Sequence, residues 1–151
     1  MRRALLAALL LAAVAAPAMA ADAGANAGEP VIGISFRGAH RAYPLVLFAE
    51  RRVVNDVVGS QEVAVFHDPG PGTSAGWFRT VLGEPIEFSG DAVGAVADDL
   101  TTVTRWDLTT GAAVAGSLAG QRLIAVPIVA TTWEGWLAAH PNAERFPPPG
   151  P

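Results

Sequence analysis

Residues 53–66 read VVNDVVGSQEVAVF, two β-branched runs on either side of a Gly-Ser pair. Val53–Val58 and Glu62–Phe66 are predicted to be the strands of a hairpin, because β-branched and aromatic residues favour extended backbone. Gly59-Ser60 is predicted to be its turn. This stretch therefore predicts antiparallel β-structure at the start of the domain.

Short strands are expected along most of the remaining chain. A preceding hairpin is predicted from Val31–Phe36 and Arg41–Leu47, around a turn at residues 37–40. Later runs of the same kind, separated by turns of Gly, Asp and Thr, cover residues 76–82, 85–88, 92–97, 103–108, 112–115 and 122–126. No long repeat is visible, which argues against a solenoid or propeller.

One helix is predicted near the C-terminus. Thr131 is expected as its N-cap, with Glu134 three residues later completing a capping box, and Pro141 ends the run. Its apolar stripe comprises Trp133, Trp136 and Leu137. Many strands and one closing helix predict a mainly β (α+β) domain: a mostly antiparallel rolled sheet or small barrel-like sandwich with the C-terminal helix packed on it.

The first 20 residues have the three parts of a secretory signal peptide. Arg2 and Arg3 provide a positive start, residues 4–16 are apolar but too few to span a bilayer, and Ala18-Met19-Ala20 is a small-x-small cleavage site. We therefore expect cleavage after Ala20. The mature protein is expected to be exported, periplasmic or secreted, with no membrane attachment after cleavage.

Removal of 20 of the 151 residues leaves 131, enough for one domain. We expect a flexible leader over residues 21–30, a single β-rich domain over 31–146 and a proline-rich tail over 147–151.

The charge and cysteine content exclude several classes of function. Without Arg2 and Arg3 the chain has 8 arginines, no lysine and 14 acids, a net charge of −6. An acidic surface repels phosphate backbones, so we expect no nucleic-acid partner. The chain has no cysteine, which excludes disulfides and thiol chemistry.

Polar residues in and beside the predicted strands are the candidate ligand-binding residues. The set comprises Arg51, Arg52, Asn55, Asp56, His67, Asp68 and Asp107. The His67-Asp68 pair adjoins a Pro-Gly loop, where binding residues are often carried. We expect both side chains at the surface, so that their alanine variants cost less than about 1 kcal/mol of stability. The arginine pair can supply charge for a small anion.

No assembled catalytic set is visible. His40, His67 and His140 lie far apart in sequence, and none has a partner histidine at metal-ligand spacing. There is no Gly-x-Ser-x-Gly elbow and no phosphate-binding loop. We therefore predict no catalytic residue, no metal site and no cofactor, and favour a binding module over an enzyme. The alternatives are a metal-binding protein, or a hydrolase using His67 and Asp68 with Asp99 or Asp107.

Several motifs together resemble bacterial domain-of-unknown-function family 3179. They are Val31-Ile32-Gly33-Ile34, Arg41-Ala42-Tyr43-Pro44-Leu45, Val53-Val54-Asn55-Asp56-x-Val58-Gly59, Thr104-x-Trp106-Asp107, residues 115–123, and Thr132-Trp133-x-x-Trp136 through His140-Pro141. The resemblance covers residues 31–146 and implies an exported domain, without assigning a reaction.

Typical members of that family carry a His-Glu pair before the Val-Asn-Asp motif and a Cys-Pro-x-Cys-Gly motif after the next strand. Those residue types would suit a metal or redox site. Here Arg51 and Arg52 stand at the first position and residues 68–72 at the second, with Pro69 and Gly72 retained and both thiols lost. The resemblance thus implies a retained loop without a thiolate site. We expect an exported, non-catalytic module that binds an unknown small ligand or protein partner.

Overall fold

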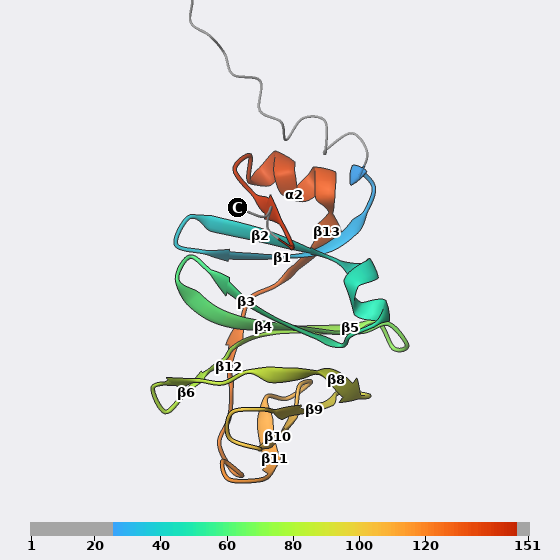
Figure 1. Cartoon of the computed structure of the whole chain (residues 1–151). Coiled ribbons are helices and arrows are strands. Elements are labelled where there is room, and N and C mark those ends of the chain that lie inside the picture. The colour runs from blue at the N-terminus through green and yellow to red at the C-terminus, as the bar shows by residue number, and fades with distance from the viewer. Residues whose placement is uncertain (1–25, 148–151) are drawn as a thin grey trace, which may run out of the picture.

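The structure is a computed structural model that describes residues 26–147. Its strands form three four-stranded sheets and one two-stranded sheet. Figure 1 shows the three larger sheets stacked as layers, with helix α2 over the first of them. The predicted signal peptide, residues 21–25 of the predicted leader and residues 148–151 of the predicted tail lie outside the described residues.

The bounds of the strands and helices follow the chain. They are β1 Pro30–Phe36, β2 Ala39–Pro44, the 3-10 helix η1 Leu45–Ala49, β3 Val53–Val58, β4 Gln61–Asp68, β5 Thr73–Phe78, β6 Thr80–Val81, β7 Glu84–Pro85, β8 Phe88–Val93, β9 Val96–Asp99, β10 Arg105–Asp107, β11 Ala112–Ala115, β12 Ile124–Val126, β13 Val129–Thr132, α2 Trp133–Ala139 and β14 Glu144–Arg145.

Each layer is one sheet with its own strand order. The upper sheet has the order β13-β1-β2-β14, the middle sheet β12-β5-β4-β3 and the lower sheet β11-β10-β9-β8. All neighbours pair antiparallel except β14 and β2, which are parallel. The prediction of a mainly β, mostly antiparallel, sandwich-like domain with one C-terminal helix is confirmed.

Strand β4 explains why the domain has a layer on each side of its middle sheet. Residues 63–67 are all buried, although side chains in a strand alternate between two faces. Val63 and Val65 pack into the core beneath the upper sheet, whereas Ala64 and Phe66 pack into the core above the lower sheet. A strand that is apolar on both faces requires cover on both.

The N-cap of helix α2 is Thr132 rather than the predicted Thr131. The Thr132 hydroxyl accepts a hydrogen bond from the Gly135 N–H at 3.1 Å. Thr131 instead pairs with Val31 in the ladder between β13 and β1. The ladder continues to Thr132, so the helix begins one residue later than the capping-box pattern indicated.

The docking face of the helix is the one predicted. Trp133 and Trp136 are buried against the upper sheet, and Leu137 packs beside them. Gly33 of β1 makes room for Trp136, because a Cβ at that position would lie 2.4 Å from the indole ring. The His140 ring lies 4.3 Å from the indole, centroid to centroid.

Several predicted strands have different limits. The run at 92–97 contains the turn between β8 and β9, and the run at 85–88 contains the break between β7 and β8. The run at 41–47 is a strand only to Pro44, after which η1 turns the chain. The run at 103–108 shortens to β10, because Val103 has a positive φ of 56°. The run at 122–126 begins at Ile124, and β5 begins at Thr73 rather than at residue 76.

Candidate ligand-binding site

Antiparallel pairing of β3 with β4 brings six of the seven candidate residues into one hairpin. Val53 lies opposite Phe66, so the chain entering β3 passes beside the end of β4. Asp107 is placed elsewhere, at the end of β10 in the lower sheet. Its carboxylate accepts a hydrogen bond from the Thr109 N–H at 2.9 Å, and so holds the turn after β10.

Arg52 and Asp68 form an ion pair at this end of the hairpin. The guanidinium lies 2.6 Å from the carboxylate oxygen Oδ1 of Asp68. The same oxygen accepts from the Gly70 N–H at 3.1 Å, and the Gly72 N–H donates to the Asp68 carbonyl at 2.9 Å. Gly72 has a φ of 73°, a conformation that favours glycine. Residues 69–72 are therefore a tight turn fastened by Asp68.

The expectation that His67 lies at the surface is wrong. His67 is only 6% exposed, and the Nδ1 atom of its ring lies 2.8 Å from the Ser74 hydroxyl. Its ring meets Phe48 edge-on, with 5.6 Å between centroids. The cause is the early start of β5, which pairs Ser74 with His67. Burial, with the nearby Arg52 charge, lowers the pKa of His67 despite the opposing effect of Asp68. The stability cost of less than about 1 kcal/mol, expected for a surface residue, therefore does not apply to His67→Ala.

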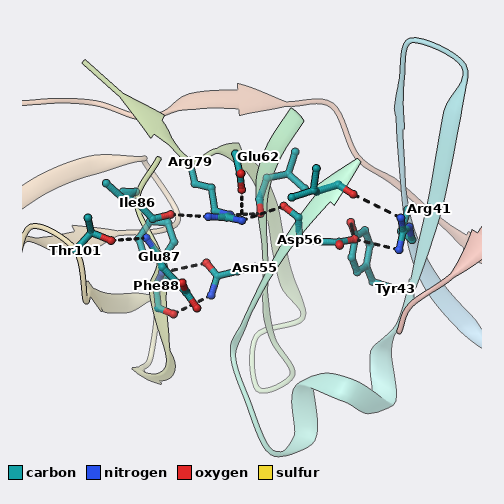
Figure 2. A network of polar contacts seen from close by, with 12 residues as sticks. Arg41, Tyr43, Asn55, Asp56, Glu62, Arg79, Ile86, Glu87, Phe88 and Thr101 are labelled. Atoms are coloured by element: carbon teal, nitrogen blue, oxygen red, sulfur yellow. Dashed lines mark hydrogen bonds and ion pairs between the residues drawn. The ribbon is translucent and has the colours of Figure 1, made fainter. Parts of the chain in front are cut away.

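Asn55 joins β3 to β8, as Figure 2 shows. Its amide nitrogen donates to the Phe88 carbonyl at 2.8 Å, and its amide oxygen accepts from the Phe88 N–H at 3.0 Å. The side chain thus gives Phe88 the two bonds that a neighbouring strand would give. Phe88 is buried, so neither backbone group has water as a substitute partner.

Asp56 faces the opposite way, toward the upper sheet (Figure 2). Its carboxylate accepts a hydrogen bond from the Tyr43 hydroxyl at 2.8 Å and lies 3.6 Å from the Arg41 guanidinium. Burial, and then the charge of Asp56, raise the pKa of Tyr43, so the phenol remains a protonated donor. Neighbouring residues in a strand point to opposite faces. The Asn55-Asp56 pair consequently connects the middle sheet to the layers on both sides.

Arg79 extends the same network (Figure 2). Its side chain donates to the carbonyls of Val63 at 3.0 Å and Ile86 at 2.9 Å, and forms an ion pair with Glu62. The segment leading into β8 is thereby held against the middle sheet. Asn55, Asp56 and Arg79 all have partners within the protein, so their polar groups serve the fold.

A hollow of about 410 Å³ remains between the start of β3 and β8. Its lining includes Arg51 and Asn55 from the candidate set. The other lining residues are Val53, Val54, Glu87, Phe88, Ser89, Gly90, Leu100 and Phe146. The sequence patterns did not indicate Glu87, Ser89, Leu100 or Phe146, because these come from separate elements and belong to no shared motif.

Arg51 differs from the other arginines in residues 26–147. It is exposed and makes no hydrogen bond, ion pair or ring contact there. The remaining seven each have a partner: Arg37 with Phe36, Arg41 with Asp56, Arg52 with Asp68, Arg79 with Glu62, Arg105 with Asp98, Arg122 with Thr110 and Arg145 with Glu29. An unpartnered guanidinium at a hollow is available to an anion.

Asp99, one of the acids that the hydrolase hypothesis requires, is buried within the lower layer. Its carboxylate accepts from the Trp106 indole N–H and the Thr102 hydroxyl, at 2.8 and 2.7 Å. Burial acts to raise the pKa of Asp99, but these bonds outweigh it and the pKa is lowered. Asp99 therefore serves as an internal acceptor.

Two broader searches cover only the described part of the chain. Within residues 26–147, no three His, Cys, Asp or Glu side chains gather closely enough to hold a metal ion. No helix there is long and apolar enough to cross a membrane.

The family model described as a protein of unknown function (DUF3179) matches residues 11–147. The chain belongs to the DUF3179 family. Searches among curated proteins and among solved structures gave no match. In this DUF3179 member, the two positions that the resemblance assigns to the His-Glu and Cys-Pro-x-Cys-Gly motifs meet in space. Arg52 stands in the first and Asp68 in the second, and they form the 2.6 Å ion pair.

Proposed function

We propose that this protein is an exported, non-catalytic binding module whose ligand carries a negative charge. The observation that carries the proposal is the Arg51 guanidinium at the hollow between β3 and β8, which has no partner within residues 26–147. A guanidinium binds a carboxylate or phosphate through two parallel hydrogen bonds. The ion pair between Arg52 and Asp68 stabilises the backbone next to it.

The rest of the lining selects the kind of anion. Leu100 is 67% exposed and Phe146 is half-buried, so together they offer an apolar wall. Glu87 on the same lining repels a second negative charge. The ligand that fits best is a monoanion with a small apolar or aromatic group.

A binding role is favoured over hydrolysis by how the candidate catalytic groups are used. Nδ1 of His67 lies at the Ser74 hydroxyl, and the Asp68 carboxylate accepts from Arg52 and the Gly70 N–H. A general base must instead reach the proton of a bound substrate or water. Asp99 and Asp107 likewise hold their own local partners.

Isothermal titration calorimetry with three probes tests the site: acetate, benzoate and phenyl phosphate. We expect benzoate to bind more tightly than acetate, because its ring covers the apolar wall. Phenyl phosphate should bind more weakly than benzoate, since it carries a second charge near neutral pH. Arg51→Gln should weaken benzoate binding about tenfold or more, the usual value of a charge-assisted hydrogen bond.

Arg37→Gln is the matched control, because Arg37 is also an exposed arginine but lies in the turn between β1 and β2. It should leave the benzoate affinity unchanged. Equal weakening in both variants would indicate a nonspecific charge effect. No measurable heat with any of the three probes would contradict the proposed ligand class.

Export has its own test. We expect the protein recovered from the periplasm or medium to begin at Ala21, because small residues at positions 18 and 20 fit the cleavage site. Intact-mass spectrometry measures this directly. A full-length species retained in the membrane fraction would count against export by cleavage.

A further inference from the structure

The hollow between β3 and β8 carries one positive and one negative group. Within residues 26–147, Arg51 and Glu87 are the only charged residues that line it. Both are exposed, and neither forms an ion pair with the other or with any further residue there. In the same part of the chain, the hydrogen bonds of Glu87 are those of its backbone. The hollow thus holds two opposite charges that the fold does not use.

Backbone bonds fix the points from which the two charged side chains start. The Glu87 N–H donates to the Thr101 hydroxyl at 3.1 Å, as Figure 2 shows. Next to Arg51, the Arg52 N–H donates to the Gly90 carbonyl at 3.0 Å. A Cβ at Gly90 would lie 3.7 Å from the Cβ of Arg51, so the arginine side chain begins against β8. Both charges are therefore carried by backbone that is already held in place.

The spacing leaves room for a small molecule between the charges. Glu87 precedes Gly90 by three residues, which is about 10 Å of extended chain. Arg51 begins beside Gly90, so the two side chains start about that far apart and do not pair directly. The hollow of about 410 Å³ lies within the range of about 300–1,000 Å³ that is usual for small-molecule sites. A ligand lying between the two side chains can contact both.

We propose that the ligand of this hollow is a zwitterion, an α-amino acid with an apolar side chain. The inference rests on the proposed function, because Arg51 binds the carboxylate in both. Glu87 binds the ammonium group, and the apolar side chain covers Leu100 and Phe146. A ligand with a carboxylate alone would take water from Glu87 without giving it a partner, which costs free energy. A zwitterion gives each of the two charges a charge-assisted hydrogen bond.

Isothermal titration calorimetry of the mature protein at neutral pH tests this with three probes that share a phenyl ring. They are L-phenylalanine, hydrocinnamate, which lacks only the ammonium group, and phenethylamine, which lacks only the carboxylate. We expect L-phenylalanine to bind about tenfold or more tightly than hydrocinnamate, the usual value of one further charge-assisted hydrogen bond. Phenethylamine should also bind more weakly than L-phenylalanine, because the Arg51 guanidinium repels its ammonium group.

Glu87→Gln identifies the group that holds the ammonium. Glutamine keeps the backbone bonds of residue 87 and removes its charge, so L-phenylalanine should lose its advantage over hydrocinnamate. Hydrocinnamate itself should bind no more weakly than it does to the wild-type protein. Glu84→Gln is the matched control, because Glu84 is an exposed glutamate of β7 that does not line the hollow. It should leave the affinities of both probes unchanged.

The outcomes separate the zwitterion from the anion site itself. Hydrocinnamate that binds as tightly as L-phenylalanine would overturn the zwitterion and leave the Arg51 site in place. An advantage of L-phenylalanine that survives in Glu87→Gln, or that is lost equally in Glu84→Gln, would also overturn it. Weaker hydrocinnamate binding in Arg51→Gln reports on the anion site alone. No heat with benzoate, hydrocinnamate or L-phenylalanine would contradict both.

Discussion

Trp136→Ala is expected to lower the free energy of unfolding by about 3–5 kcal/mol, the cost of deleting a buried indole. Trp136 is 3% exposed and covers Gly33, whose missing side chain gives the ring its place on the upper sheet. Alanine would leave a cavity between β1 and the helix. Urea denaturation followed by far-UV circular dichroism measures the change.

Trp136→Phe separates packing from hydrogen bonding. The indole nitrogen of Trp136 is buried and has no hydrogen-bond partner in the structure, so phenylalanine removes no bond. We expect it to cost clearly less than alanine, since much of the ring contact remains. A cost below about 1 kcal/mol for Trp136→Ala would show that the helix does not depend on this contact.

The second large effect is expected at Asn55. Asn55→Ala removes both partners of the Phe88 backbone and leaves a buried N–H and a buried C=O unsatisfied. Each such group costs about 1–3 kcal/mol, so we expect a total loss of about 2–6 kcal/mol. The same denaturation experiment measures it.

Asn142→Ala provides the comparison for Asn55. Asn142 is exposed, and its amide makes one long contact of 3.5 Å with the Gly38 carbonyl. Its loss should cost less than about 0.5 kcal/mol. If the two asparagine variants were equally stable, the hydrogen bonds between Asn55 and Phe88 would not stabilise the contact of β3 with β8. The side of the hollow formed by Asn55 would then not be held in place by these bonds.

Local patterns predicted the elements that depend on neighbouring residues. The β-branched runs Val53–Val58 and Glu62–Phe66 led to the central hairpin, and the spacing of Trp133 and Trp136 led to the docking face of the helix. Both signals arise within one element. The side chain of Asn55, by contrast, bonds to a backbone 33 residues away, and no pattern within β3 indicates that distance.

In the candidate site, too, residues were predicted from local patterns, whereas contacts between distant segments were not. Arg51 and Arg52 were singled out from sequence, but their different roles were not. Arg52 has a partner because Asp68 ends the facing strand, whereas Arg51 has none in the described residues. His67 was expected at the surface, at a strand end, because it adjoins a loop rich in proline and glycine. That composition in fact forms a turn tight enough for β5 to cover the histidine at once.

The pairing of β1 with β13 has a kinetic consequence. Pro30 lies opposite Thr132, so the upper sheet joins segments separated by about 100 residues of chain. Contacts of such long range slow folding, because the entropy of loop closure is lost before the pairing is gained. Until the last segment has joined, β1 lacks its outer neighbour and the upper face lacks its helix. We therefore expect refolding after dilution from urea to be slow for a domain of this size, and to end with the arrival of the C-terminal segment.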